Sequence, residues 1–149
     1  MVTGVAQAYL DRAPPLAFTG QLPRWKMPRD THQVLDLSAL YRPITKWGFS
    51  LEPRNSAASV AKALDVAAAE RPGPVHIEVP SDVGNKECDD DDSAFGGPTP
   101  SRHPALEPSD DAIRQAASLL LKSERPVLIV GMSAARAGAT ERLTALTEA

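Results

Sequence analysis

Near the middle of the chain, a helical pattern of hydrophobic residues is followed by a short apolar run. Between Ser56 and Ala68, apolar residues recur at the three- and four-residue spacing of one helix face, and the many alanines favour a helix. The prolines of Arg71–Pro74 must end that helix, because proline cannot continue it. The following run, Val75–Val79, is typical of a strand. The pattern therefore predicts a helix, a break and a strand.

The same order returns near the C-terminus. Ser109 is a favourable N-cap, and the two aspartates after it suit the positive end of a helix dipole. The apolar stripe of that helix stops before Pro126, and Val127–Val130 is a continuous apolar run, as in strands that are buried on both faces. Repeated helix–break–strand units indicate an α/β fold, in which helices cover both faces of a parallel sheet.

The first fifty residues follow this scheme less closely. We expect helices over Val2–Arg12 and Thr31–Leu40, and strands over Pro15–Thr19 and Ile44–Trp47. The segment Gln21–Asp30 holds two prolines and several charged residues, which predicts a loop.

An acidic segment rich in proline and glycine divides the chain. It includes four consecutive aspartates, and because like charges repel and proline and glycine interrupt regular structure, we expect an exposed linker. The predicted regions are residues 1–86, the linker 87–108, and residues 109–149, which are short for an independent domain.

Composition excludes several classes of protein. A length of 149 residues corresponds to about one domain. The net charge of −3 and the pI of about 5.6 do not provide the positive field that nucleic acids or anionic membranes attract, so we expect neither as a partner. The single cysteine, Cys88, cannot form an internal disulfide or a cysteine zinc site. No apolar run approaches the roughly 18 residues of a membrane span, and we expect a cytoplasmic protein.

No motif supports catalysis by itself, since the chain has no nucleophile elbow, P-loop, metal-spaced histidine pair or GxGxxG turn. Gly131–Gly138 follows a predicted strand, so it could hold a phosphate on free backbone N–H groups or be a simple tight turn.

Four segments together resemble one family. They are GVAQAYLDRAPPLAFTGQ at Gly4–Gln21, RPITKW at Arg42–Trp47, ERPGPVHIEVPSDV at Glu70–Val83, and Ala112–Ala149 with its ERPVLIVG. In content and order they resemble the thiamine diphosphate-dependent enzymes of the acetolactate synthase and benzaldehyde lyase-like group. The resemblance implies that residues 1–86 are the second half of a pyrimidine-binding domain. Residues 109–149 would be the first αβ unit of a Rossmann-like central domain.

The resemblance also implies chemistry. The parent protein would use thiamine diphosphate and Mg²⁺ to make or break carbon–carbon bonds next to a carbonyl, on a 2-oxo acid or an aldehyde. It would be a homodimer or homotetramer; FAD in the central domain has no support in these residues. The family's activating glutamate and GDG metal motif fall outside this sequence, so we expect the chain alone to be inactive.

Gln33 and Lys46 match site positions of that family, His32 departs from its usual phenylalanine, and Gln21 is a candidate from its place in the chain. His32-Gln33 occupies the place of a common Phe-Gln pair, and the amide of Gln33 would hydrogen-bond an oxygen that develops charge near the reacting carbon. His32 would add an acid–base group or merely cap a short helix. Lys46 matches a lysine near the substrate entrance, where a cation would favour anionic substrates. Gln21 follows a predicted strand end and is a candidate for cofactor binding.

Two alternatives remain at this point. Without the resemblance, Gln33 and Lys46 would be interpreted as solvated surface residues. The chain would then be a non-catalytic α/β module that binds a nucleotide or a protein partner, rather than part of an enzyme.

Overall fold

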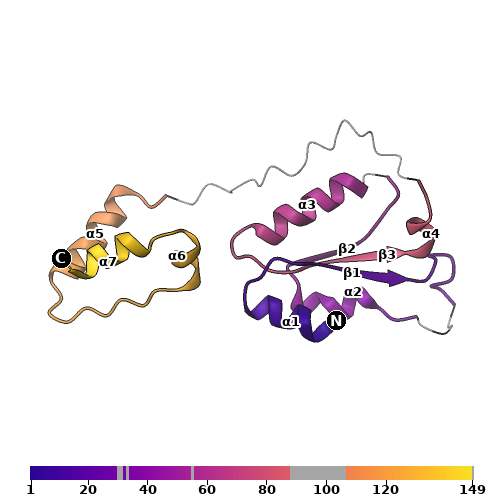
Figure 1. Cartoon of the computed structure of the whole chain (residues 1–149), viewed down its shortest axis with the longest axis horizontal. Helices are drawn as coiled ribbons and strands as arrows, with labels where there is room; N and C mark the ends of the chain where they lie inside the picture. Colours follow the sequence, from indigo (N-terminus) through magenta and orange to yellow (C-terminus); the bar gives the residue numbers. More distant parts are fainter. Residues whose placement is uncertain (30–31, 33, 55, 88–106, 149) are drawn as a thin grey trace. The chain divides into compact units, whose positions relative to one another are not determined.

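The computed structural model describes residues 1–29, 32, 34–54, 56–87 and 107–148 (Figure 1). The chain divides into two compact units, residues 1–105 and 106–149. The predicted linker, 87–108, lies almost wholly outside the described residues, so its boundaries stay a prediction.

The first unit is built on a three-stranded parallel sheet. The strands are β1 (Leu16–Gln21), β2 (Trp47–Ser50) and β3 (Val75–Pro80), in the order β1-β3-β2. Because all three run in one direction, their starts lie at one edge of the sheet, which we call the amino edge. Their ends lie at the other, the carboxyl edge. Residues 75 to 80 of β3 span the two edges, a distance of about 16 Å.

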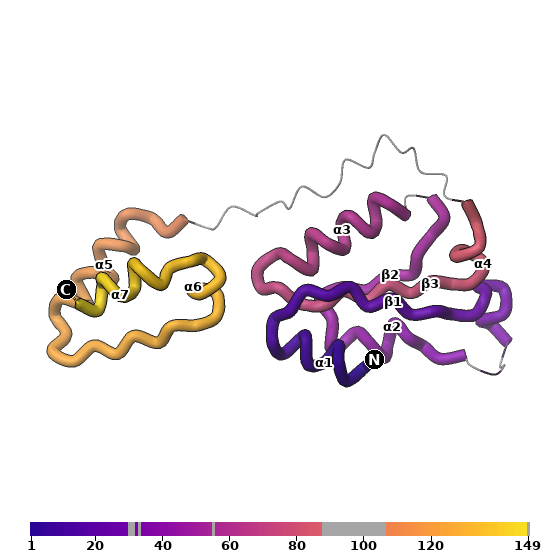
Figure 2. Tube along the Cα trace, viewed as in Figure 1, coloured from indigo at the N-terminus to yellow at the C-terminus, as the bar shows by residue number. Residues whose placement is uncertain are grey.

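Helices cover both faces of this sheet, which confirms the predicted fold class (Figures 1 and 2). Helices α1 (Val2–Leu10) and α2 (Leu37–Tyr41) lie on one face, and α3 (Ser56–Ala68) lies on the other. The 3₁₀ helix η1 (Arg42–Ile44) precedes β2, and the short helix α4 (Ser81–Gly84) follows β3.

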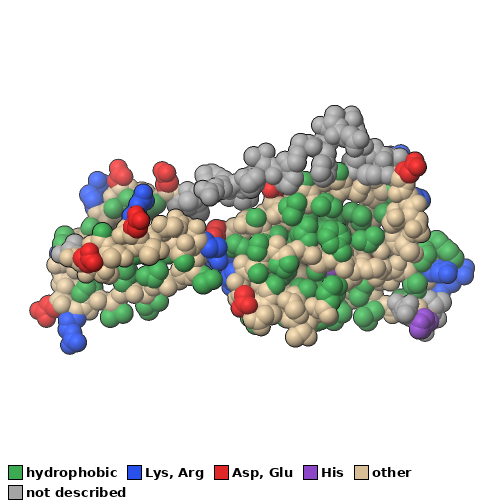
Figure 3. Space-filling view, in the orientation of Figure 1, with side chains coloured by type: hydrophobic (Ala, Val, Ile, Leu, Met, Phe, Trp, Pro, Cys, Tyr) green, Lys and Arg blue, Asp and Glu red, His purple; other side chains and the backbone are tan. Residues whose placement is uncertain are grey.

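A small apolar core lies on each face. Ala63 and Ala67 of α3 pack on Val75 and Ile77 of β3, all four being buried. Alanines at the contact let the helix lie close to the sheet. On the opposite face, the buried residues Val5, Ala17 and Tyr41 join α1, β1 and α2. Figure 3 shows hydrophobic side chains gathered over the visible face of this unit.

Two predicted elements of the first unit are displaced. The strand expected over Ile44–Trp47 is wrong, because Arg42–Ile44 form η1 with a proline in its first turn, and β2 begins only at Trp47. Of the helix expected over Thr31–Leu40, only α2 is found. It begins at Leu37 because the carboxylate of Asp36 accepts a hydrogen bond from the Ala39 N–H at 2.8 Å and so caps it.

The second unit holds α5 (Asp110–Leu121), α6 (Met132–Arg136) and α7 (Thr140–Glu148). The predicted cap is confirmed, since Ser109 Oγ accepts from the Ala112 N–H at 3.3 Å. The strand expected over Val127–Val130 is wrong. These side chains are 44–91% exposed, and no strand occurs in the described part of the unit. A strand exists only with a neighbour for its backbone hydrogen bonds, and this unit presents none.

No helix among the described residues is both long and apolar enough to cross a membrane.

Candidate functional site

The carboxyl edge of the sheet gathers polar side chains from three different connections. Gln21 ends β1, Glu52 follows β2, and Asp82 lies in α4 directly after β3. In open parallel sheets, ligands bind in the crevice outside the carboxyl ends of the strands. The carboxyl edge is therefore the candidate site, and the loop 22–35, which follows β1, is its largest connection.

Gln21 fastens the base of that loop. Its side chain is buried, at 8% exposed, and its Nε2 donates to the Leu35 carbonyl at 3.0 Å. Its Oε1 accepts from the Leu22 N–H at 2.9 Å. Both ends of the amide are thus used within the loop. The predicted cofactor contact of Gln21 stays a prediction, while the geometry gives this residue a local structural role.

Arg24 holds the same loop to its neighbours. Its Nε donates to Asp82 Oδ2 at 3.0 Å, its backbone N–H donates to Asp82 Oδ1 at 3.1 Å, and its Nη1 donates to Glu52 Oε2. One guanidinium therefore joins the connections that follow all three strands. We call these three residues the arginine clamp.

The clamp fixes the charge of its members. Burial alone would raise the pKa of the Asp82 carboxyl, but hydrogen bonds from the backbone and side chain of Arg24, with the guanidinium charge, lower it. The hydrogen bonds to Asp82 and Glu52 raise the pKa of Arg24. Both shifts favour the charged forms of Arg24 and Asp82 at neutral pH.

The other two predicted site residues of this loop, His32 and Gln33, follow Arg24 in the sequence. His32 is exposed in a turn. Gln33 lies outside the described residues, so its catalytic role stays a prediction. His32, which was expected in a helix over Thr31–Leu40, lies instead in the loop that begins after Gln21, and its role in the site stays a prediction.

Lys46 lies at the opposite edge. It precedes the first residue of β2, and its Nζ donates to the carbonyls of Val66 and Ala69 at the C-terminal end of α3. Burial lowers the pKa of the Lys46 ammonium, which the charge of Glu70 partly opposes. A cation on the last carbonyls of a helix satisfies unpaired acceptors and favours the helix dipole. The structure does not bring Lys46 together with Gln21 or His32.

Sequence analysis missed a buried polar group under α2. His76 is 1% exposed; its Nε2 lies 2.8 Å from Thr19 Oγ1, and its ring stacks on Tyr41 with centroids 4.3 Å apart. Burial lowers the pKa of His76. Glu78, 5% exposed on the same face, has its pKa raised by burial and by the charge of nearby Asp36. The polar–apolar alternation in Val75–Val79 was the available signal.

The described residues contain no cluster of three or more histidine, cysteine, aspartate or glutamate side chains that could hold a metal ion.

The fold has a counterpart among solved structures. The Rhodococcus jostii RHA1 thiamine diphosphate-dependent 4-hydroxybenzoylformate decarboxylase matches with a TM-score of 0.73 and 23% identity, over 87% of this chain and 25% of that one. This match establishes the class of fold, an α/β domain with a parallel sheet.

Comparison of sequences is more specific. A probable acetolactate synthase large subunit of Methanocaldococcus jannaschii and an acetolactate synthase of Arthrospira platensis are each 37% identical over 153 residues, which cover 99% of this chain and 26% of each relative. The acetolactate synthase of Mycobacterium bovis is 35% identical over 99% of this chain and 24% of its own length. No protein-family model matches.

These findings confirm the resemblance to the acetolactate synthase group of thiamine diphosphate enzymes along almost the whole chain. The chain spans about a quarter of the length of the relatives it matches.

Proposed function

We propose that this chain is part of a thiamine diphosphate- and Mg²⁺-dependent enzyme that makes or breaks a carbon–carbon bond next to a carbonyl, acting on a 2-oxo acid. The observation that supports this most strongly is the 37% identity to acetolactate synthase large subunits over 99% of the chain. Two relatives of 37% identity and one of 35% carry the same activity in their names.

The carboxyl edge would be this chain's share of the active site. The fit of the cofactor is partial: the edge offers polar side chains and a firmly held loop, while the described residues contain no metal cluster. When bound, thiamine diphosphate supplies carbanion chemistry at a carbonyl carbon. The chain's own residues would orient the substrate and stabilise charge as it develops.

Within this proposal, Gln33 is the catalytic residue of the loop. Its amide would donate to the substrate oxygen that gains negative charge, without changing its own charge. His32, exposed beside it, would exchange a proton with the substrate or with solvent. Lys46 has no part in this proposal, because its ammonium is used at the amino edge.

The decisive experiment is a Gln33→Ala substitution in the longer protein of which this chain would be part. Loss of one preorganised donor is expected to lower kcat about a hundredfold. Cofactor affinity, measured by fluorescence quenching, is expected to change little. Gln115→Ala, in α5 of the second unit, is the matched control. Unchanged kcat in Gln33→Ala would contradict the assignment.

The chain of 149 residues should by itself show no turnover of pyruvate with thiamine diphosphate and Mg²⁺. Turnover above the buffer blank would contradict the proposal that further parts are required. The alternative of a non-catalytic module would be supported if the longer protein bound no thiamine diphosphate.

A further inference from the structure

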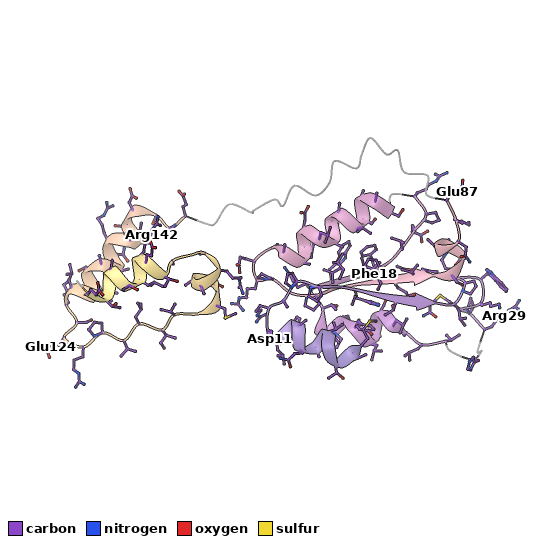
Figure 4. All side chains as sticks on the ribbon, in the orientation of Figure 1. Asp11, Phe18, Arg29, Glu87, Glu124 and Arg142 are labelled. Atoms are coloured by element: carbon purple, nitrogen blue, oxygen red, sulfur yellow. The ribbon has the colours of Figure 1, made fainter. Side chains whose placement is uncertain are left out.

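Two cations of the loop 22–35, Lys26 and Arg29, both lie near the ring of Trp25. The Nζ of Lys26 lies 5.0 Å from the centroid of the Trp25 ring, and the guanidinium carbon of Arg29 lies 6.0 Å from the same centroid. Trp25 is 61% exposed. Cation–π attraction holds a positive charge near an aromatic ring, so Trp25 keeps both cations within about 6 Å of its centroid. Figure 4 labels Arg29 at the outer end of this loop.

These two cations differ from the third cation of the loop. Arg24 is paired with Asp82 and Glu52 in the arginine clamp. Among the residues that the structure describes, no carboxylate forms an ion pair with Lys26 or Arg29. Their positive charge is therefore available to an anion from solution.

The backbone beneath the cations is ordered by local hydrogen bonds. The Lys26 N–H donates to the Pro23 carbonyl at 2.8 Å, and the Arg29 N–H donates to the Lys26 carbonyl at 3.0 Å. Gln21 and the arginine clamp hold the same loop to the carboxyl edge. The backbone that carries the two cations is therefore already ordered, which lowers the conformational entropy lost when an anion binds.

We propose that Lys26 and Arg29, supported by Trp25, recognise the carboxylate of a small 2-oxo acid at the carboxyl edge. This rests on the proposed function and names the residues that would give it a preference for anionic substrates. A carboxylate accepts charge-assisted hydrogen bonds from an ammonium and a guanidinium on its two oxygens. The exposed face of the indole would contact the apolar part of the substrate.

The chain contains a matched control for this site. Lys62 lies over the other tryptophan, Trp47, with its Nζ 4.9 Å from the ring centroid. The distance from cation to ring is nearly the same as for Lys26 and Trp25. However, Trp47 is the first residue of β2, at the amino edge, and it has one cation beside it instead of two. The sequence has only these two tryptophans, so each gives its own indole N–H signal in a ¹⁵N-labelled sample.

The experiment is a titration of the full 149-residue chain, followed by NMR, with sodium pyruvate, its neutral analogue methyl pyruvate, and inorganic phosphate at constant ionic strength. We expect pyruvate to shift the Trp25 indole signal saturably and to leave Trp47 unmoved. Methyl pyruvate should shift neither signal. Equal shifts of both signals, or a response of Trp25 to phosphate at lower concentration than to pyruvate, would overturn the proposal.

Charge reversal sharpens the result. In the double variant Lys26→Glu/Arg29→Glu, we expect the half-saturating pyruvate concentration to rise at least about fivefold, the order expected for loss of two exposed ion pairs. Lys62→Glu should leave it unchanged. Unaltered binding in the double variant, with the amide spectrum of the fold retained, would overturn the proposal.

The test separates this inference from the proposed function. If pyruvate binds at Trp25 but the longer protein binds no thiamine diphosphate, the proposed function fails and the anion site stands. If the longer protein turns over 2-oxo acids while Trp25 does not respond, the anion site is wrong and the proposed function stands.

Discussion

At the amino edge of the sheet, Lys46 directs its ammonium inward, onto the last carbonyls of α3. At the carboxyl edge, Lys26 and Arg29 lie on the ring of Trp25, with no described carboxylate paired to them. The same residue type therefore serves the fold at one edge and faces solvent at the other. Charge alone does not identify a site residue; the groups that already satisfy its donors must be counted first.

The contacts that hold the two edges differ as well. The amino edge is held by the single ammonium of Lys46 on the end of α3 and by apolar packing, as where Trp47 stacks on Phe49 with ring centroids 4.5 Å apart. The carboxyl edge is held by side chains, through Gln21 and the arginine clamp. Side-chain fastening can be removed one residue at a time without destroying the sheet, so the two edges can be tested separately.

The largest effect on stability is expected at Tyr41, which joins α2 to the sheet. Helix α2 is capped by Asp36, whose charge raises the pKa of Glu78, and it ends at Tyr41, which is 3% exposed and stacks on His76. Tyr41→Ala should lower the free energy of unfolding by about 3 to 5 kcal/mol, as for other buried aromatic truncations. Tyr9→Ala, a truncation of a partly exposed ring on α1, is the control and should cost about 1 kcal/mol. Equal losses of unfolding free energy in the two variants, measured by urea denaturation, would show that Tyr41 contributes no more than a partly exposed ring.

The next effect distinguishes the edges directly. Lys46→Met removes two charge-assisted hydrogen bonds at the end of α3 and should destabilise the chain by about 1 to 2 kcal/mol. Lys62→Met, on the exposed side of α3, should change stability by less than about 0.5 kcal/mol. The response of Trp25 to pyruvate should be the same in both. If Lys46→Met kept full stability but failed to bind pyruvate, Lys46 would be a substrate-binding residue after all.

A smaller effect depends on pH. Because the pKa of Glu78 is raised in the folded chain, its ionisation weakens the fold as the pH rises above the ordinary carboxyl value of 4.5 and through the raised one. Glu78→Gln should therefore be more stable than the natural chain at pH 7, and the difference should vanish below pH 4.5. The exposed Glu87→Gln is the control for the charge change. Urea midpoints at pH 7 and pH 4 measure both, and a destabilised Glu78→Gln at pH 7 would contradict the direction.

The smallest expected effect on stability comes from the arginine clamp. Arg24→Met should release the loop while the sheet remains, since the Arg24 side chain is 39% exposed and lies outside both apolar cores. The amide hydrogens of Met27 and Arg29, which lie in turns of the loop, should exchange faster with solvent. Arg54→Met, an exposed arginine near Glu52, is the control. Unchanged exchange in Arg24→Met would mean that the loop is held by Gln21 alone.

Much of the fold could be predicted from local sequence. Helix α3, strand β3 and the Ser109 cap all follow from residues that lie next to one another, and the structure confirms them. The strand expected over Val127–Val130 failed because an apolar run states only that a segment favours burial. Whether it becomes a strand depends on a neighbouring backbone, which the run itself does not encode.

The candidate site was less predictable. Gln21 could be placed because it ends a strand, and strand ends are visible in sequence. The contacts of Lys46 could not be predicted, because the carbonyls that accept from its ammonium lie 20 and 23 residues away, and its substrate-binding role stays a prediction. The arginine clamp could not be predicted at all, because Arg24 and Asp82 are 58 residues apart and meet only when β1 and β3 pair in register.

The strand order has a consequence for synthesis of the chain. The middle strand of the sheet, β3, is the last of the three along the sequence. Between the end of β1 and the start of β3, a ribosome adds residues for about 3 to 10 s at ordinary rates of elongation. During that interval β1 and β2 have been made, but the strand on which both pair has not. The sheet can therefore close only after Pro80 has been made, so its assembly cannot proceed strand by strand as the chain emerges.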